Sequence, residues 1–379
     1  MNQKRILFVC GGVSEEHSIS LLSASSLLSA LPPHYDPVVV GIEKSGHWRK
    51  LPSANPILNA ESARTVKLSP AGELAWLLPY ADELGRALLQ TATETTPLDV
   101  VFPILHGKGG EDGSLQGLLE MIGVPFVGSS CSGAAICLDK GVSKRLVEQA
   151  GYRVAPFVEC SEPTLTATQK KQIEGWGFPV FVKASRQGSS VGVFKVDTAQ
   201  RLLGALTEAF QFDSKCVIEK GIRGKELEVA VLSEGHHIEA AGVAELQFRA
   251  DIPFYTYDAK YLDTSAMTPR IPADLTPAQT AELCQMAIHL FSTLDCYGMA
   301  RLDFFWDIQA QKFIFNEANT IPGFTTLSLF PTLWKWAGTT YSRLVERLIQ
   351  SAFVRPGLRL HHAHSRDGGE VSPKAAQSS

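Results

Sequence analysis

The sequence predicts an α/β protein made of two or three compact units, and three observations support this fold class. A chain of 379 residues is too long for one small domain and long enough to bury ample core. Hydrophobic residues make up 45% of the chain and charged residues 20%, as in ordinary globular proteins. Continuous apolar runs, RILFVC, YDPVVVGI and LDVVFPIL, stand beside helical patterns and indicate a parallel sheet covered by helices on both faces.

The first unit is expected to be an open α/β layer that spans residues 1–129. It begins with the strand RILFVC, which turns through two glycines into a helix with Ser14 as the expected N-cap. Leucines and small residues continue this helix until Pro32 and Pro33, which should end it. The runs YDPVVVGI and LDVVFPIL then supply two further buried strands.

Two further units and a tail are expected after this layer. Residues 130–220 are predicted to form the helix DKGVSKRLVEQAG, the strand FPVFVKAS, the loop RQGSSVG, the strand VFKV, a second helix and the strand KCVIEK. Residues 221–353 contain the predicted hairpin ARLDFFWDIQAQKFIFNEAN. Residues 354–379 lack hydrophobic periodicity, so we expect a disordered tail.

Charge, hydropathy and cysteine content argue against several classes of function. A net charge of -4 creates no field that would attract nucleic acid or an anionic membrane. The apolar run at residues 6–10 is too short for a signal peptide, and no run is long enough to span a bilayer. The seven cysteines are scattered without C-x-x-C spacing, which favours reduced thiols of a cytoplasmic protein over disulfides or a zinc site.

Polar, glycine-rich stretches follow two of the buried strands. The segment CGGVSEEHS lacks G-x-G-x-x-G spacing, so a dinucleotide cofactor is not expected. Glu16, near the start of the following helix, either is stabilised by the helix dipole alone or faces a cationic ligand. The segment HGKGGEDGSLQG, residues 106–117, follows the carboxyl end of its strand, where open α/β sheets bind ligands. The alternative for this segment is a tight turn into a helix.

The middle unit offers a candidate phosphate-binding loop. Lys183 lies at the end of the strand VFVK, and the segment SRQGSSVG supplies backbone N–H groups and hydroxyls that could cover phosphates. No G-x-x-x-x-G-K-[ST] sequence occurs, so this is not a Walker A loop. The alternative is a flexible surface loop, but the position between two apolar strands favours a lid over nucleotide phosphates.

The hairpin in the third unit carries the candidate metal ligands. Side chains two residues apart share a face of a strand, so Arg301 lies beside Asp303, and Glu317 beside Asn319. A five-residue loop at residues 308–312 would place Asp303 opposite Glu317, whereas an even loop without a bulge would put them on opposite faces. Two carboxylates and an amide suit magnesium completed by phosphate oxygens, and Arg301 could stabilise a transferring phosphoryl group or an oxyanion. The alternative for Glu317 and Asn319 is a solvated strand end.

Seven segments in a fixed order resemble those of one family. They are GGVSEEHSIS, HGKGGEDGSLQG, KASRQGSSVG, IEKGIRGKELE, YTYDAKY, ARLDFF and NEANTIPGFTTLS. Together they look like the D-alanine–D-alanine ligases of the ATP-grasp superfamily over residues 4–349, and GIEKSGHW looks like the larger bacterial form. Ala184 stands where proline often follows the lysine, and Gln187 occupies a variable loop position. These two departures concern the stiffness of the loop rather than the groups assigned to chemistry.

The resemblance implies a three-domain ATP-grasp architecture, with the nucleotide held between two α+β domains at residues 130–220 and 221–353. It implies a cytoplasmic, homodimeric enzyme that joins two D-alanines for peptidoglycan synthesis, through an acyl phosphate of the first D-alanine, with release of ADP and phosphate. It also implies ATP and two Mg²⁺ ions, for which Mn²⁺ is a possible substitute. The alternatives are an ATP-grasp ligase with other substrates, a variant that uses D-lactate, an ATP-binding protein without catalysis and, last, a nicotinamide dehydrogenase.

The resemblance also implies roles for individual residues. Glu16 would hold the ammonium group of the first D-alanine, and other substrate contacts would come from His106, Ser328, the Leu329 N–H and Lys260. Arg301 and the Gly323 N–H would form the oxyanion site. The loops that close over the reaction and exclude water would carry Ser189, Lys260 and Tyr261. ATP would be bound by Lys140, Lys183, Ser190, Glu219, Lys220, Gly221, Ile222 and Glu226. The metal ligands would be Asp303, Glu317 and Asn319.

Overall fold

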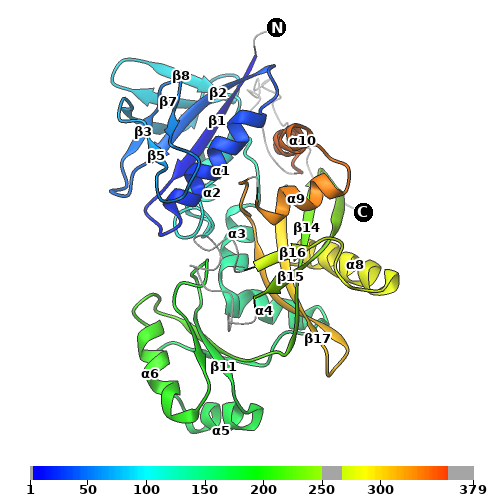
Figure 1. Ribbon diagram of the computed structural model, residues 1–379. Helices are drawn as coiled ribbons and strands as arrows, with labels where there is room; N and C mark the ends of the chain where they lie inside the picture. Colours follow the sequence, from blue (N-terminus) through cyan, green and yellow to red (C-terminus); the bar gives the residue numbers. More distant parts are fainter. Residues whose placement is uncertain (1–2, 250–266, 326, 357–379) are drawn as a thin grey trace, which may run out of the picture.

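The computed structural model describes residues 3–249, 267–325 and 327–356, which form three sheets of four or more strands with flanking helices. The N-terminal sheet lies at one end of the molecule and a four-stranded sheet at the other, with a five-stranded sheet between them (Figure 1). The α/β fold class is therefore confirmed. The predicted tail falls outside the described residues from residue 357 onward, so its disorder stays a prediction.

The N-terminal sheet is parallel in one half and antiparallel in the other. Its elements are β1 (Lys4–Gly11), α1 (His17–Ala30), β2 (Tyr35–Ile42), β3 (Trp48–Lys50), β6 (Glu73–Ala81), β7 (Ala87–Thr91), β8 (Thr95–Leu98), β9 (Val100–Pro103) and α2 (Ser114–Ile122), with a separate pair β4 (Ile57–Leu58) and β5 (Lys67–Leu68). The strand order is β8-β7-β6-β3-β2-β1-β9, and β1 pairs in parallel with β2 and β9, as the apolar runs predicted. The prediction of a parallel sheet was wrong for the other strands. Residues 44–98 contain no helix, and the connections from β2 to β3, from β6 to β7 and from β7 to β8 are too short for a parallel crossover. β3 also pairs antiparallel with β6, across a longer connection that contains β4 and β5.

The first helix begins later than the sequence predicted. Glu16 occupies the N-cap position of α1, so the prediction of Ser14 as N-cap was wrong. The Ser14 hydroxyl instead donates to the His106 carbonyl at 2.7 Å, an acceptor on a loop that no local pattern places beside it. The helix ends at Ala30, before the two prolines, as predicted.

The middle unit forms a small sheet with its own apolar core. Its elements are β10 (Phe157–Cys160), α5 (Ala167–Trp176), β11 (Val180–Ala184), β12 (Val193–Val196), α6 (Ala199–Ala209) and β13 (Cys216–Lys220). The strands are antiparallel in the order β10-β13-β11-β12, and the predicted strands FPVFVKAS, VFKV and KCVIEK correspond to β11, β12 and β13. Ile173 of α5 and Leu206 of α6 join Val182 of β11 in one buried cluster, so both helices cover the same face.

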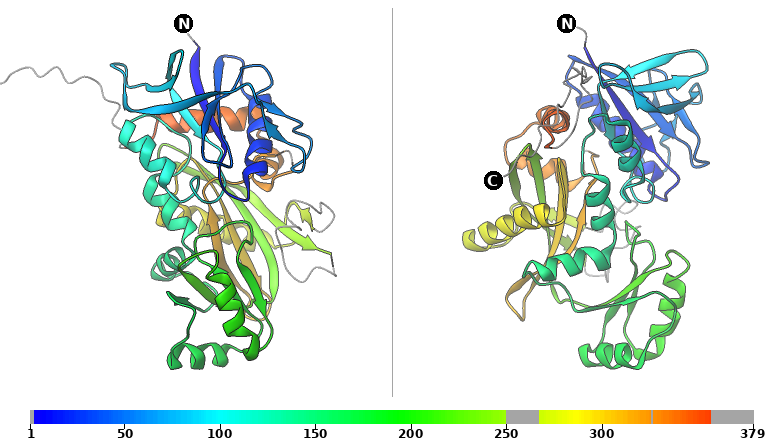
Figure 2. Two further views of the ribbon diagram at one scale, coloured as in Figure 1. Left: turned by 90° about the vertical axis from the view of Figure 1, so that its left-hand side faces the viewer. Right: turned by 180° about the vertical axis from the view of Figure 1, so that it is seen from behind.

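The third sheet is antiparallel and carries the predicted hairpin at one edge. Its strands, in spatial order, are β16 (Met267–Arg270), β15 (His237–Phe248), β14 (Gly224–Glu234), β17 (Met299–Asp307) and β18 (Lys312–Asn319). Its helices are α8 (Pro277–Thr293), α9 (Leu329–Trp336) and α10 (Tyr341–Phe353), and two earlier helices, α3 (Cys131–Leu138) and α4 (Lys140–Gln149), pack beside β18. On β14, Val231 joins Leu283 of α8 in one buried cluster, whereas Leu232 joins Leu348 of α10 in another. The helices α8 and α10 therefore cover opposite faces of this sheet, which Figure 2 shows from two further sides.

One apolar core joins the N-terminal sheet to the C-terminal helices. Phe8 stacks on Phe102 with ring centroids 5.5 Å apart, and Phe102 meets the edge of Phe324 at 6.2 Å. Phe324 in turn packs against Phe330 of α9 at 5.4 Å, and the same buried cluster includes Leu348 of α10. These contacts fix the N-terminal unit against the residues that follow β18. Among the described helices, none combines the length and the apolar character needed to cross a lipid bilayer.

Candidate active site

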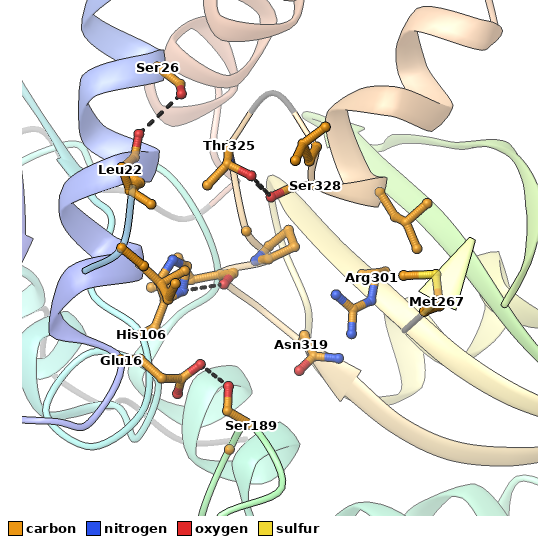
Figure 3. Close-up of a pocket in the computed structure, with 18 of the residues that line it drawn as sticks. Glu16, Leu22, Ser26, His106, Ser189, Met267, Arg301, Asn319, Thr325 and Ser328 are labelled. Carbon is orange, nitrogen blue, oxygen red and sulfur yellow. Dashed lines mark hydrogen bonds between the residues drawn. The ribbon is translucent and has the colours of Figure 1, made fainter. Parts of the chain in front are cut away.

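A cavity of about 600 Å³ lies where the N-terminal unit, the loop between β11 and β12 and the five-stranded sheet meet (Figure 3). Glu16 and His106 line it from the N-terminal unit, and Ser189 lines it from the loop after β11. Arg301 and Asn319 line it from β17 and β18. The fold therefore brings together candidate residues that the sequence places in four separate segments.

Arg301 is held between two carboxylates on neighbouring strands. Its Nε lies 2.9 Å from Oε2 of Glu228, and it donates two hydrogen bonds to Asp303, from Nε at 2.8 Å and from Nη2 at 2.7 Å. Burial alone would lower the pKa of Arg301, but the charges of Asp303 and Glu228 outweigh burial and raise it. The guanidinium is therefore a fixed positive charge that faces the cavity.

The hairpin places Asp303 directly opposite Glu317, which confirms the predicted pairing. The predicted five-residue loop is wrong, because Asp307 pairs with Lys312 and leaves only residues 308–311 in the loop. A bulge compensates for this even loop: Phe304 pairs with Phe315 and Asp303 with Glu317, so Asn316 has no partner in the ladder. The extra residue restores the shared face that a four-residue loop alone would lose.

The donor atoms on this face fit a magnesium ion. Asp303, Glu317 and Asn319 present carboxylate and amide oxygens, the hard ligands that magnesium prefers, and Asn319 Nδ2 donates to Asp303 at 3.0 Å. The described residues contain no group of three or more His, Cys, Asp or Glu side chains arranged for a metal. Two carboxylates and one amide would therefore need further oxygens, such as those of a phosphate. Lys140 lies 3.6 Å from Glu317, which adds a cation for phosphate charge.

Glu16 and Ser189 connect the first helix to the loop after β11. The Ser189 hydroxyl donates to Oε1 of buried Glu16 (Figure 3). A Cβ at either Gly107 or Gly188 would lie 3.0 Å from Glu16 Oε2, so both glycines let the backbone approach the carboxylate closely. Ser189 and Ser190 have φ values of 49° and 61°, a left-handed conformation that persists where surrounding contacts enforce it.

His106 and Glu111 lie on the loop that follows β9, and both are buried. His106 Nδ1 donates to the Ile321 carbonyl at 3.0 Å (Figure 3), and its Nε2 lies 3.4 Å from the Ser23 hydroxyl. Burial lowers the pKa of His106, although the charge of Glu16 opposes this effect, so the ring is neutral near pH 7. Burial raises the pKa of Glu111 to about 8, and the Glu16 charge acts in the same direction.

Gly323 and Ser328 lie next to each other at the start of α9. A Cβ on Gly323 would lie 2.7 Å from the Ser328 hydroxyl, so only glycine fits there without displacing Ser328. The same hydroxyl accepts a hydrogen bond from the Thr325 N–H at 3.0 Å. Leu329 is the first residue of α9, and its N–H belongs to a helix N-terminus, which favours an anion such as a carboxylate.

Lysines and glutamates form a second buried cluster beside β11 and β13. Lys183 lies 2.8 Å from Glu219 Oε2, and Lys144 of α4 lies 3.3 Å from Glu219 Oε1. Burial alone would raise the pKa of Glu219, but these two lysines outweigh it and lower the pKa. Glu219 is itself buried, so its charge is balanced by these two ammonium groups rather than by solvent.

The remaining candidates for nucleotide binding surround this cluster. Lys140 begins α4, and its ammonium donates to the Gln187 carbonyl at 2.7 Å. Lys220 ends β13, and Gly221 and Ile222 connect it to β14, on which Glu226 and Glu228 share a face. Two other candidates, Lys260 and Tyr261, lie outside the described residues.

Comparison with known proteins agrees with this geometry. The family model described as "D-ala D-ala ligase N-terminus" matches residues 5–129, and the one described as "D-ala D-ala ligase C-terminus" matches residues 146–350. The chain belongs to the D-alanine–D-alanine ligase family. D-alanine–D-alanine ligase A of Chromobacterium violaceum is 40% identical over 371 residues, which cover 97% of this chain and 99% of that protein.

Two solved structures of D-alanine–D-alanine ligases resemble the whole fold. The enzyme from Coxiella burnetii superposes with a TM-score of 0.79 at 31% identity, covering 93% of this chain and 94% of that one. The enzyme from Bacillus anthracis, solved as a complex with ATP, superposes with a TM-score of 0.68 at 26% identity, covering 93% and 98%. The ATP-grasp resemblance seen in the sequence segments thus extends over nearly the full chain.

Three buried charged residues near the site were not predicted from the sequence. Glu228 lies two residues after the candidate Glu226, so strand alternation could have placed both on one face. Lys144 follows Lys140 by one helical turn, which could have placed both on the same face of α4. For Glu111 the sequence offers no comparable signal, because its partner Ile321 is 210 residues away.

Proposed function

We propose that this chain is an ATP-dependent ligase that joins two D-alanines into D-alanyl-D-alanine. One observation carries the proposal: a single cavity has Glu16 on one wall and Arg301 with Asn319 on the other. The first wall suits an ammonium group and the second suits a carboxylate under transfer of a phosphoryl group. A small amino acid has both groups on neighbouring atoms.

The reaction balances in two steps. The carboxylate of the first D-alanine attacks the γ-phosphorus of ATP, which forms an acyl phosphate and releases ADP. The amine of the second D-alanine then attacks the acyl carbon, loses a proton, and displaces inorganic phosphate as the peptide bond forms. In this assignment Glu16 holds the ammonium group of the first substrate by a charge-assisted hydrogen bond, while Arg301 and the Gly323 N–H stabilise the oxyanion of the tetrahedral intermediate.

Asp303, Glu317 and Asn319 are the proposed ligands of two Mg²⁺ ions, with Mn²⁺ as a possible substitute. Bound magnesium would neutralise phosphate charge and orient the phosphates of ATP. Arg301 contributes a positive charge that does not depend on metal, because Asp303 and Glu228 keep it ionised. Asp303, Glu317 and Asn319 would thus hold the ions close to Arg301, which is hydrogen-bonded to Asp303 and would stabilise negative charge on the reacting carboxylate.

The remaining assignments concern the nucleotide and the second substrate. Lys140 and Lys183 would contact the ATP phosphates together with the loop at Ser190, and Glu226 would bind the ribose hydroxyls. The adenine would be bounded by Glu219, Lys220, Gly221 and Ile222. The Ser328 hydroxyl and the Leu329 N–H would bind the carboxylate of the second D-alanine, and His106 would line the first subsite. Ser189, Lys260 and Tyr261 would belong to the elements that close over the site.

The wider context is also a proposal. The product would serve peptidoglycan synthesis in the cytoplasm, and the chain would act as a homodimer. Its domains would span residues 1–129, 130–220 and 221–353, with a tail at residues 354–379. The proposed subsite for the first D-alanine lies between the first and third of these units, since Glu16 and Arg301 line one cavity.

Phosphate release from ATP tests the proposal directly. Purified protein with ATP and magnesium should release phosphate when D-alanine is added and remain near background with L-alanine. Mass spectrometry should identify one D-alanyl-D-alanine for each phosphate released. A product containing only another amino acid, or phosphate release that does not depend on D-alanine, would refute the substrate assignment. D-lactate, offered as second substrate beside D-alanine, tests whether a hydroxyl can replace the amine.

A further inference from the structure

Side chains from a distant loop hold both backbone polar groups of Ile321. Its N–H donates to Oε1 of Glu111 at 3.4 Å, and its carbonyl accepts a hydrogen bond from His106 Nδ1 at 3.0 Å. Ile321 is 210 residues from Glu111 and 215 residues from His106 along the chain, and all three residues are buried. The N-terminal unit therefore determines the position of the two peptide groups that flank the Cα of Ile321 in the third unit.

The segment after β18 depends on such contacts because it has left the sheet. β18 ends at Asn319, and Pro322 has no N–H to donate. At the other end of the segment, the Phe324 N–H donates at 3.1 Å to Ser23, a residue of α1. Residues 321–324 are thus tied to the N-terminal unit on both sides of Gly323.

Glu111 is placed to connect two backbone segments with one carboxyl group, whose two oxygens can each accept a hydrogen bond. Oε2 accepts the Gly107 N–H at 2.7 Å, within its own loop, while Oε1 faces Ile321. The loop itself is closely packed, because a Cβ on Gly110 would lie 2.3 Å from the Leu105 carbonyl oxygen. The carboxyl group of Glu111 is therefore held by closely packed backbone, which keeps its second oxygen beside Ile321.

We propose that Glu111 is a positioning residue that, together with His106, aims the Gly323 N–H at the oxygen of the reacting carboxylate. This inference rests on the proposed function, which makes Gly323 an oxyanion donor. The consequence is that the unit that carries Glu16 for the substrate ammonium also sets the position of the oxyanion site. The N-terminal unit would then position both the group that binds the first substrate and the group that stabilises the intermediate.

The variant Glu111→Gln tests this role. Glutamine keeps the size of the side chain but has one acceptor oxygen, so its amide nitrogen would face one of the two N–H groups and one hydrogen bond would be lost. A misplacement of about 1 Å at a reacting centre can lower the rate by about 100-fold. We therefore expect kcat to fall by about 10- to 100-fold, while KM for ATP and for the first D-alanine changes by less than about threefold.

Asp112→Asn is the matched control on the same loop. Asp112 accepts hydrogen bonds from Gly109 at 2.8 Å and Ser114 at 3.0 Å, but it holds no backbone group of residues 321–324 in the described structure. Its kcat should stay within about twofold of wild type. Equal losses in Asp112→Asn and Glu111→Gln would overturn the proposal, because they would show a general effect of the loop.

A second measurement separates positioning from folding. A phosphinate analogue of the tetrahedral intermediate should bind Glu111→Gln more weakly by about the factor lost in kcat, while ADP binds as in wild type. Glu111→Asp, which keeps both oxygens, should recover part of kcat. Wild-type kcat in Glu111→Gln, or equal weakening of the analogue and ADP, would overturn the proposal. Absence of D-alanine-dependent phosphate release in the wild type would instead refute the proposed function.

Discussion

Replacement of Lys144 by methionine should destabilise the chain by about 3 kcal/mol. The Lys144 side chain is 1% exposed, lies 3.3 Å from Glu219 and donates to the Asn316 carbonyl at 3.1 Å. Removal of one partner from a buried ion pair costs about 3–5 kcal/mol, because the other charge stays in a medium that solvates it poorly. Glu219 would keep Lys183 at 2.8 Å, so the lower end of this range applies.

Thermal unfolding followed by circular dichroism measures the effect. At about 2.1 cal/mol/K of unfolding entropy per residue, a chain of 379 residues shifts by about 1.3 °C per kcal/mol, so Tm should fall by about 4 °C. Arg145→Met is the matched control, since Arg145 is the next residue of α4 and its side chain, 56% exposed, pairs with Glu159 at the surface. Its Tm should change by no more than about 1 °C. A Tm of Lys144→Met equal to that of this control would refute the reasoning, because Lys183 alone would then suffice for Glu219.

Three further predictions concern the site. Glu317→Gln should lower kcat by at least about 100-fold at saturating magnesium because the metal loses a charged ligand, and a near-normal kcat would rule out the assignment. Glu16→Gln should raise KM for the first D-alanine more than for the second, since an amide pairs poorly with an ammonium; equal rises would count against its role. Burial depresses the pKa of His106, so the stability contributed by the neutral ring is complete above about pH 6.5 and is lost as pH falls through the lower folded-state value. Between about pH 6.5 and 5, the Tm of the wild type should therefore fall more steeply than that of His106→Gln, and parallel curves would contradict this.

Strand alternation predicted that Asp303 and Glu317 share a face of the hairpin, but it did not predict the length of the loop or the bulge. Because side chains alternate with a period of two, Asp303 and Glu317 can share a face either through an odd loop or through an even loop with one bulge. The sequence does not distinguish these two solutions, and the chain adopts the second, with Asn316 as the extra residue. The consequence is functional, since the Asn316 carbonyl and side chain accept hydrogen bonds from Lys144 and Lys183.

Two causes account for most of what the sequence did not predict: weak local patterns in some strands and contacts between residues far apart in the chain. The antiparallel strands β3 and β6 to β8 are partly exposed and alternate weakly; β6, for example, leaves Trp76 49% exposed, so no clear pattern marks it. Glu111 stands in a glycine-rich loop whose local sequence is equally compatible with a simple turn. Its partner Ile321 becomes a neighbour only through the tertiary fold.

The aromatic contact between Phe102 and Phe324 has a consequence for protein synthesis. The first sheet packs its apolar face against residues of α9 and α10, which a ribosome would add after the strands of the other two sheets. Nascent chains that contain only the N-terminal unit would expose Phe102 and its neighbours and be prone to aggregation. The four-stranded sheet, which has its own apolar core, can complete its packing earlier. The N-terminal unit is translated before the other two sheets but is thus expected to reach its native packing after them. Mutations in α10 should therefore lower the yield of soluble protein, even though none of the described residues that line the cavity belongs to that helix.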